Sequence, residues 1–532
     1  MPSFRQGARE LMFFWQQRTL LKGIVLSLSL LWLFADVPAS VAQYTTITLL
    51  HFSDYHSHAM PFYSEGQANT AGIARAIAYL KPFAADPNTL IFSGGDSMNR
   101  GAPAWSDKYR CTEWSWWNGI VDAMAFGNHD ADYGAEAFAR CRTQISYPIL
   151  SANTLDSQQQ PLFQHDGKTY AVFGVAGMKI GVFALAGADF ARLVKPEWLP
   201  VPGTTFADRV QVARQVVQAL RENEHANAVV LIGHALYEDD LALAQAVPGI
   251  DVIFGTHSHR REELTHIPGT RTMIISPFQY LTYISKVELT FTDGELRNVS
   301  GSLVRMSNDL PQDPEIARRV AQMQTDLEAE PQYAPLFQPI GAADVELSTQ
   351  GQVSGESILG DFVLDIVRSA AQTHLALITS SGFREPIPPG IIREETLRTA
   401  LPYPNRILVY AMTGAQIQNL LHYSVSRSGS DFFSQVSGVR FRVGENTATD
   451  IQVLKDPANL AAGYLPLDPA ATYTVATTDF QGLVAGGYKE IFAQAAPRDT
   501  GLEVRDQVRS FFQAHRPVTA RLDGRITAGK NR

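Results

Sequence analysis

Histidine, aspartate and asparagine side chains recur in short segments along this 532-residue sequence. The segment "GNHDADYG" (127–134) carries Asn128 and His129 near a glycine, although a turn by itself needs no histidine flanked by acids. Four further segments hold residues of the same kinds: "HFSDYHSH" with Asp54 and His56, "SGGDS" with Asp96, "IGHAL" with His234, and "GTHSH" with His257 and His259. A single aspartate of this sort more often caps a helix, and a single histidine more often packs in a core. The complete set of imidazoles, carboxylates and one amide favours a site for Zn, Mn, Fe or Co rather than Ca.

The number of these side chains bears on how many ions they hold. They exceed what one ion needs, so we expect two ions that share a carboxylate. Two ions about 3.5–4 Å apart can clamp a phosphoryl group and lower the pKa of a shared water molecule. Such a site needs no covalent nucleophile. The sequence does not say which metal is bound.

Each of the five segments follows a stretch predicted to be a buried strand. Predicted strands alternate with helical stretches from Tyr44 to about Met306, a pattern typical of a layered α/β domain. Ligands of α/β sheets gather at the carboxyl ends of the strands, so we expect the segments to converge. The predicted strands are 46–52, 89–95, 121–127, 179–186, 228–234 and 250–257, and two of the predicted helices are 70–81 and 207–223.

The segments before and after this α/β pattern predict a signal peptide, a linker and a second domain. Basic residues, the apolar run "GIVLSLSLLWLF" and the small residues of "ASVAQ" predict a secretory signal peptide over 1–42, cut after Ala42. The alternative is a retained anchor, but the run is shorter than the ~20 residues that span a bilayer. We therefore expect export to the periplasm or the extracellular space and no stable membrane anchor. The predicted domains are 43–308, a helical linker over 309–340 with Asp313 as its N-cap, and a C-terminal domain over 341–532.

Composition narrows the class of protein. Hydrophobic residues make up 45% and charged residues 18%, as in ordinary globular proteins. The formal net charge is −9 and no basic tract is present, which disfavours a nucleic-acid polymer as partner. The two cysteines, Cys111 and Cys141, are expected to pair in an exported protein, with two free thiols as the alternative. Three tryptophans at 114, 116 and 117 are expected to be packed in the core rather than to line a pocket.

The five segments, in this order and with "GHALYEDD" and "GNHDADYG", resemble the calcineurin-like metallophosphoesterases. More closely they resemble the exported 5′-nucleotidase family, which includes UDP-sugar hydrolases and 2′,3′-cyclic-nucleotide phosphodiesterases. The resemblance implies a four-layer α/β/β/α sandwich joined by a helix to a mixed α+β C-terminal domain. It also implies hydrolysis of phosphate esters of nucleotides by a hydroxide that bridges two divalent metal ions.

The resemblance also implies roles for single residues. One ion would be held by Asp54, His56, Asp96 and His259, and the other by Asp96, Asn128, His234 and His257. His129 matches a histidine that is not a ligand and faces the scissile phosphate, and Asp132 matches the acid that orients it. The alternative for Asp132 is a cap on the following helix. His58 has no assigned role, and we expect it to support the ligands.

In the C-terminal domain the resemblance concerns the leaving group of the substrate. It implies that Arg384, Tyr403, Asn405 and Phe480 contact a nucleotide, with the two aromatic rings stacking on the base. A surface salt bridge for the arginine and core packing for the rings are the alternatives. "VAGGY" departs from the family pattern, because Gly486 stands where an acid is expected to bind sugar hydroxyls.

Two other functions are compatible with the sequence. Sulfur-oxidation hydrolases with a di-manganese centre are similar over much of the chain, and the altered "VAGGY" permits that function. A non-catalytic metal- or phosphate-binding protein of the envelope is the other, although the full ligand set with His129 and Asp132 argues against it. The sequence leaves the preferred ester and the oligomeric state open.

Overall fold

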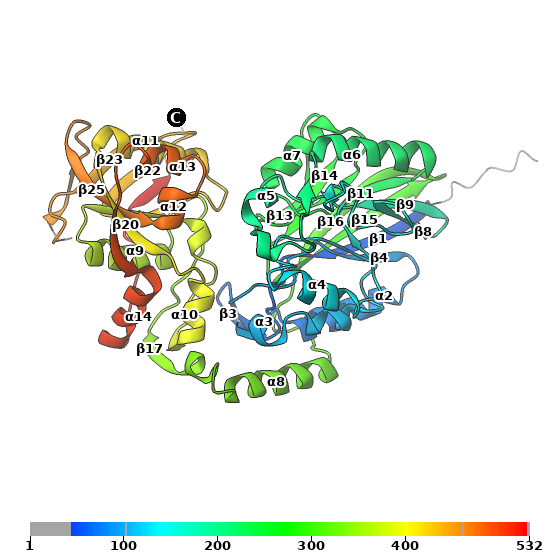
Figure 1. The fold of residues 1–532 in the computed structure, drawn as a ribbon, viewed down its shortest axis with the longest axis horizontal. Helices are drawn as coiled ribbons and strands as arrows, with labels where there is room; N and C mark the ends of the chain where they lie inside the picture. Colours follow the sequence, from blue (N-terminus) through cyan, green and yellow to red (C-terminus); the bar gives the residue numbers. More distant parts are fainter. Residues whose placement is uncertain (1–43, 102–103, 460–461, 529–532) are drawn as a thin grey trace, which may run out of the picture.

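The computed structural model describes residues 44–101, 104–459 and 462–528 (Figure 1). The predicted signal peptide lies outside these residues. The described chain forms two lobes that lie side by side and are joined by the long helix α8 (Pro314–Ala329). Nowhere in this part of the chain is a helix both long and apolar enough to cross a bilayer.

Two six-stranded sheets form the centre of the first lobe. One has the order β16-β15-β1-β4-β5-β6 and the other β13-β14-β12-β11-β9-β8. The strands of the first sheet are β1 (Tyr44–Phe52), β4 (Thr89–Ser93), β5 (Ala123–Ala125), β6 (Ile149–Leu150), β15 (Tyr283–Thr292) and β16 (Glu295–Arg305). Those of the second are β8 (Tyr170–Val175), β9 (Met178–Phe183), β11 (Ala228–Leu231), β12 (Val252–Phe254), β13 (Arg261–His266) and β14 (Met273–Pro277).

Helices cover the two outer faces of these sheets. Aliphatic side chains of β1 and β4 pack between the sheets against those of β9, β11 and β12. The outer face of the first sheet is covered by α2 (Ile73–Ala84), α3 (Ala104–Tyr109) and α4 (Gly134–Arg142). The outer face of the second sheet is covered by α6 (Arg209–Gln218) and α7 (Tyr237–Ala246). The layers are therefore α/β/β/α, and the predicted sandwich is confirmed.

Strand direction fixes where the candidate ligands can lie. β1, β4 and β5 run parallel in one sheet, and β9, β11 and β12 run parallel in the other. All six predicted strands form, because each is an apolar run that is buried on both faces. The carboxyl ends of β1, β4 and β5 thus open onto one edge of the sandwich, and those of β11 and β12 open beside them.

The second lobe has its own sheets and core. Its five-stranded sheet has the order β21-β18-β25-β20-β26, and its four-stranded sheet has the order β24-β23-β22-β27. The five strands are β18 (Leu375–Thr379), β20 (Arg406–Thr413), β21 (Ser434–Ser437), β25 (Thr472–Thr478) and β26 (Arg498–Glu503), and the four are β22 (Val439–Val443), β23 (Ala448–Leu454), β24 (Tyr464–Pro466) and β27 (Ile526–Ala528). The larger helices are α9 (Ile358–Ala371), α11 (Gly414–Ser426) and α14 (Val504–Ala514). This mixed α+β arrangement is the one expected for the C-terminal domain.

Shorter elements complete the lobes. In the first lobe they are β2 (Phe62–Ser64), β3 (Gln67–Thr70), the 3₁₀-helix η1 (Thr112–Trp117), β7 (Thr154–Leu155), α5 (Phe190–Leu193) and β10 (Thr205–Phe206). In the second they are β17 (Pro339–Ala343), β19 (Gly390–Arg393), α10 (Glu394–Ala400), α12 (Asp479–Leu483) and α13 (Tyr488–Phe492).

The connecting helix α8 begins as the sequence predicts. The side chain of Asp313 accepts hydrogen bonds from the backbone N–H groups of Glu315 and Ile316, which is N-capping. Its apolar side packs on the first lobe, with Val320 and Leu327 buried. The helix is therefore anchored to the first lobe before the chain enters the second. The boundaries 309–340 of the linker stay a prediction.

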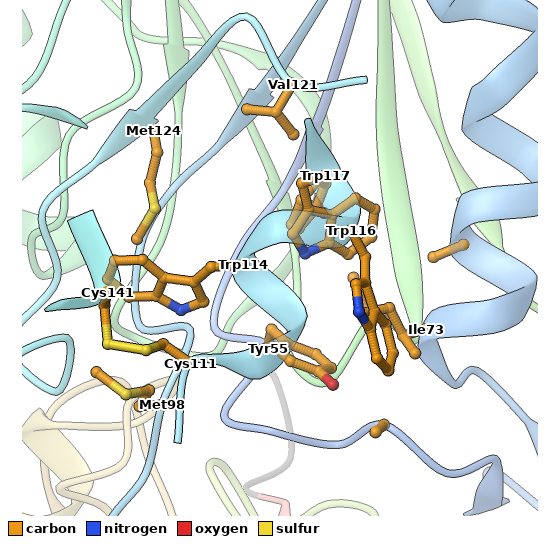
Figure 2. Packing of buried hydrophobic residues seen from close by; sticks show 14 of the residues in the cluster. Tyr55, Ile73, Met98, Cys111, Trp114, Trp116, Trp117, Val121, Met124 and Cys141 are labelled. Carbon is orange, nitrogen blue, oxygen red and sulfur yellow. A yellow bond between two sulfur atoms is a disulfide. The ribbon is translucent and has the colours of Figure 1, made fainter. Parts of the chain in front are cut away.

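A disulfide joins Cys111 to Cys141, with the Cα atoms 5.7 Å apart, so the predicted pairing is confirmed (Figure 2). It ties the turn that opens η1 to α4, and the segment that carries Asn128 and His129 lies between the two cysteines. Trp114 packs beside the bridge, and the indoles of residues 114, 116 and 117 are all buried in the same core, as predicted.

Removing the bridge tests its contribution to stability. We expect the double variant Cys111→Ala, Cys141→Ala to lose ~3–4 kcal/mol in the free energy of unfolding, because a loop of about 30 residues is no longer closed in the unfolded chain. Urea denaturation measures this, and reduced wild-type protein should lose a similar amount. An unchanged free energy of unfolding in both samples would contradict the prediction.

Candidate metal centre

The predicted ligands from both sheets meet at one edge of the sandwich, and they form two clusters. The first contains Asp54 and His56 after β1 and His259 after β12. His259 Nε2 lies 3.1 Å from His56 Nε2 and 3.2 Å from Asp54 Oδ1. Three donor atoms therefore point at one another within the reach of a single cation.

The second cluster contains Asp96 after β4, His234 after β11 and His257 after β12. His234 Nε2 is 3.1 Å from Asp96 Oδ2, in a geometry that makes no hydrogen bond. Asp96 Oδ2 is also 3.7 Å from His56 Nε2, so this carboxylate lies between the two clusters. The resemblance implies two sets of ligands that share Asp96, and the assignment of single ligands to each ion stays a prediction.

Buried donor atoms without partners indicate that these residues fit metal ions. Among the described residues, His234 Nε2 and Asn128 Oδ1 are buried and have no hydrogen-bond partner. An unpaired buried polar atom costs ~1–3 kcal/mol, and a cation at this point removes that cost for both atoms. The donor set and the orphaned atoms therefore both fit divalent ions.

The backbone is strained where the ligands lie. Five of the seven predicted ligands have positive φ angles, a conformation that residues other than glycine seldom adopt. They are Asp54 (52°), His56 (47°), Asp96 (51°), His257 (55°) and His259 (45°). The neighbouring loops also approach backbone to backbone, since a Cβ atom on Gly127 would lie 2.3 Å from the amide nitrogen of Asp96. Such strain clusters at functional sites.

Hydrogen bonds orient the imidazoles. His56 Nδ1–H donates to the carbonyl oxygen of Met98 (3.1 Å), and His234 Nδ1–H donates to that of Gly94 (2.7 Å). Each bond fixes the tautomer and leaves the Nε2 lone pair facing the cluster, as in metal sites with backbone-supported histidines.

Burial and charge set the protonation of these groups. Burial lowers the pKa of His56 well below its usual value, and burial with the Arg384 charge does the same to the pKa of His259. Burial works to raise the pKa of Asp96, but His234 and His129 outweigh it, and the pKa falls well below the usual range. Burial would lower the pKa of His234, but the charges of Asp96 and Asp54 raise it to about 10, so this imidazole loses a proton when it binds a metal ion. His56 and His259 as neutral imidazoles and Asp96 as an ionised carboxylate already have the forms that bind metals.

His129 and Asp132 form a hydrogen-bonded pair beside the clusters. His129 Nδ1 is 2.8 Å from Asp132 Oδ2, which also accepts from the amide of Arg100. Burial would lower the pKa of His129, but the charges of Asp132 and Asp96 raise it to about 10. Asp132 does not cap the following helix α4, whose N-cap residue is Tyr133. The pair therefore presents an imidazolium to the site at neutral pH.

Two carboxylates that the sequence analysis did not single out support the clusters. Asp189 Oδ2 lies 3.1 Å from His257 Nε2, which leaves Nδ1 as the free ring nitrogen. Asp130 accepts from the amides of Ser97 and Gly127 and so ties two ligand loops together. Asp189 was within reach of the same argument, because it follows the predicted strand 179–186. Asp130 was within the same reach, because it follows the predicted strand 121–127 by the same number of residues.

A pocket of about 280 Å³ lies between the two lobes. It is lined by Asp96, Asn128, His129, His257 and His259 from the first lobe, and by Arg384, Tyr403, Asn405 and Phe480 from the second. Arg384 ion-pairs with Asp431 at 3.6 Å, and one of its NH groups lies 3.3 Å from His259 Nε2. All four residues predicted from the C-terminal domain therefore reach the same space as the metal clusters.

His58 contacts a ligand loop and also bridges the lobes, since its Nδ1 lies 2.9 Å from the carbonyl oxygen of His56. Its ring stacks on Tyr280, with the centroids 3.6 Å apart, and its Nε2 hydrogen-bonds to the carboxylate of Glu385. The contact with the backbone of His56 agrees with the expected support for the ligands, which stays a prediction. It contributes to the contact that brings the second lobe against the metal clusters.

Comparison with known families matches both lobes. The calcineurin-like phosphoesterase family matches residues 47–261, and the 5′-nucleotidase C-terminal domain family matches residues 339–494. Each match falls within one lobe, so the order of the two families along the chain is the order of the two lobes.

Individual relatives extend over nearly the whole chain. Protein UshA of Yersinia enterocolitica is 24% identical over 528 residues, which are 89% of this chain and 92% of that protein. The 5′-nucleotidase precursor of Thermus thermophilus has a TM-score of 0.71 and 26% identity, and the match covers 92% of this chain and 100% of that one. A sulfate thiohydrolase from Thermus thermophilus has a TM-score of 0.70 and covers 93% and 98%, but at 19% identity it shows the fold alone.

The sandwich, the two clusters and these matches define a metal-dependent phosphoric ester hydrolase that uses two divalent ions. More closely, the chain belongs to the 5′-nucleotidase family of calcineurin-like phosphoesterases.

The contact between Asp189 and His257 generates a test. We expect Asp189→Asn to weaken divalent-ion binding by about 10–100-fold, because the carboxylate no longer orients the imidazole and raises its basicity. Calorimetric titration of the metal-free protein with Mn²⁺ or Zn²⁺ measures the affinity. Asp166→Asn, at an exposed carboxylate, is the matched control. Equal affinities in the two variants would show that Asp189 has no such role.

Proposed function

We propose that this protein hydrolyses phosphate esters of nucleotides, as a 5′-nucleotidase does, at a two-metal centre. One observation carries the proposal: the pocket between the lobes joins the ligand clusters and His129 to Arg384, Tyr403 and Phe480. A phosphate ester has two parts, and this pocket offers a separate group of residues to each. The name of the similar 5′-nucleotidase precursor of Thermus thermophilus supports the same reaction.

The first group of residues holds the ions. We assign Asp54, His56, Asp96 and His259 to one ion, and Asp96, Asn128, His234 and His257 to the other. When bound, the ions supply Lewis-acid polarisation of the phosphoryl group and activation of water. The chain's own contribution is to fix these donors in place, through the amides that hold the two aspartates and the carbonyls that hold His56 and His234.

His129 provides positive charge next to the phosphoryl group. Its Nδ1 is held by Asp132, so Nε2 is free to face the pocket, which His129 lines. An imidazolium there stabilises charge that develops on the phosphoryl oxygens and can give its proton to the leaving oxygen. Asp132 positions the ring and keeps it protonated.

The second lobe binds the leaving group. Tyr403 is 42% exposed and lines the pocket together with Phe480, so both rings have a face available for a nucleobase. Arg384 offers a guanidinium to phosphate oxygens at the edge of the first cluster. A nucleotide would thus contact both lobes at once.

The proposal includes the cellular location of the protein and the boundaries of its domains. Export with cleavage of residues 1–42 agrees with the apolar leader in the sequence. The domains 43–308 and 341–532 agree with the two lobes, each with its own hydrophobic core.

A phosphate-release screen tests the reaction. We expect purified protein loaded with Mn²⁺, Zn²⁺ or Co²⁺ to release phosphate from nucleoside 5′-monophosphates, and chelation to abolish release until metal is restored. UDP-sugars and 2′,3′-cyclic nucleotides in the same screen show how far the specificity extends. Turnover of a sulfur-containing carrier peptide but of no phosphate ester would instead establish the sulfur-oxidation alternative, and no turnover at all would establish a binding protein.

The role of His129 has its own test. We expect His129→Asn to lower kcat by about 10²–10⁴-fold with two ions still bound, because the group that stabilises charge is lost and the ligands are kept. Steady-state kinetics with a nucleoside monophosphate and metal analysis of the same sample measure both. His165→Asn, at a partly exposed histidine away from the site, is the control. Near-normal kcat in His129→Asn would refute the role.

A further inference from the structure

One wall of the interlobe pocket brings a cation of the first lobe against the backbone of the second. Arg192 lies on the short helix α5, on the side of the first lobe that is turned towards the second lobe (Figure 1). Its NH1 group is 3.5 Å from the point where a Cβ atom on Gly486 would lie. Gly486 has no side chain to occupy that space, so the guanidinium faces the pocket directly.

A second arginine lines the same pocket from the other lobe. Arg427 follows α11, and its guanidinium lies over the ring of Phe432, 5.7 Å from the centroid. Its Nε is buried without a hydrogen-bond partner among the described residues. Tyr423, one turn earlier, donates a hydrogen bond to the carbonyl of Gly486. Arg427 therefore comes directly after the last turn of α11, the turn that packs beside the Gly486 backbone through Tyr423.

The other charged side chains of the pocket are matched or lie elsewhere. Arg384 pairs with Asp431, and Asp189 pairs with His257. Glu238 is exposed, and its charge acts on Asp431.

In contrast, the two remaining arginines that line this pocket, Arg192 and Arg427, form no ion pair with any described residue. The charge of Arg192 acts on Asp189, but neither guanidinium has a carboxylate within ion-pairing distance among the described residues. An anion between the lobes would therefore stabilise both groups.

The position of these groups says what kind of anion fits. Gly486 comes three residues after the end of α12, the helix that carries Phe480. The arginines thus adjoin the wall that contacts the leaving group in the proposed function. A guanidinium binds phosphate and carboxylate oxygens in a fork, and both groups have that geometry.

We propose that Arg192 and Arg427 form a subsite for a second anionic group, a phosphate or a carboxylate, on the leaving group of the phosphate ester. The inference rests on the proposed function, since it concerns the leaving group of that reaction. It names the preferred substrate class: phosphomonoesters whose alcohol carries a further negative charge. Because one arginine comes from each lobe, the subsite is complete only when the lobes lie as they do here.

Matched pairs of esters test the subsite. Adenosine 5′-monophosphate and adenosine 3′,5′-bisphosphate differ by one phosphate, and glycerol 3-phosphate and 3-phosphoglycerate differ by one carboxylate. We expect wild-type enzyme to have the higher kcat/KM for the more anionic member of at least one pair. The pair that shows the preference identifies the anion. No preference in either pair would overturn the proposal.

Three variants place the preference on these residues. Arg192→Gln and Arg427→Gln should each lower kcat/KM for the more anionic ester of the preferred pair by about ten-fold. For the other ester of the pair, kcat/KM should stay within about three-fold of the wild-type value. Gly486→Asp adds a carboxylate beside Arg192 without a close contact, and it should remove the same preference. Arg140→Gln, at an exposed arginine on α4, is the control and should change neither ester. Equal losses for both members of a pair would overturn the subsite.

Binding measurements separate this proposal from the proposed function. Calorimetric titration of the metal-loaded protein with the same ligands needs no turnover. If no ester is cleaved, the proposed function fails, yet tighter wild-type binding of the anionic ligand that Arg192→Gln removes would still support the subsite. Equal affinities of wild type for both ligands of each pair would overturn it.

Discussion

The structure depends on holding imidazole nitrogens and carboxylate oxygens together in a buried space where few of them can bond to one another. His56 Nε2, His259 Nε2 and Asp54 Oδ1 are all electron-pair donors at contact distance. Such an arrangement is unfavourable without a cation. The fold tolerates it because backbone carbonyls bind the far side of the rings and backbone amides bind the carboxylates. These hydrogen bonds offset the unfavourable free energy of placing the donor atoms together.

The sandwich explains how seven candidate ligands from distant parts of the chain meet. Parallel strands in one sheet deliver their loops to a single edge, and the face-to-face packing of two such sheets brings two edges together. The loops then turn sharply, with left-handed residues and with Gly127 lying against the Asp96 backbone. Asp130 fastens two of these loops through their amides, and the nearby disulfide restrains the α4 side. Rigid scaffolding thus surrounds a strained site.

In the proposed function, the two lobes divide recognition of an ester between them. The first lobe supplies the metal ligands and His129, and the second supplies aromatic rings and Arg384. Contacts such as that of His58 with Glu385 hold the lobes so that the groups share one pocket. An arrangement of this kind ties catalysis to the relative position of the lobes, because neither lobe alone encloses the pocket. It also lets the leaving-group side vary while the metal side keeps its ligands, as the glycine at 486 illustrates.

The sequence alone determined the six strands and the connecting helix and predicted the candidate metal ligands, since each is a local pattern: an apolar run, an N-cap, or a polar residue after a strand. The disulfide between Cys111 and Cys141 could also be predicted from the sequence, because only two cysteines are present. The sequence did not determine the partner of His257, the contact of His58 across the lobes, or the approach of Arg192 to Gly486. These join residues 68, 327 and 294 positions apart, and no local pattern encodes such pairs. They follow only from how sheets and lobes pack.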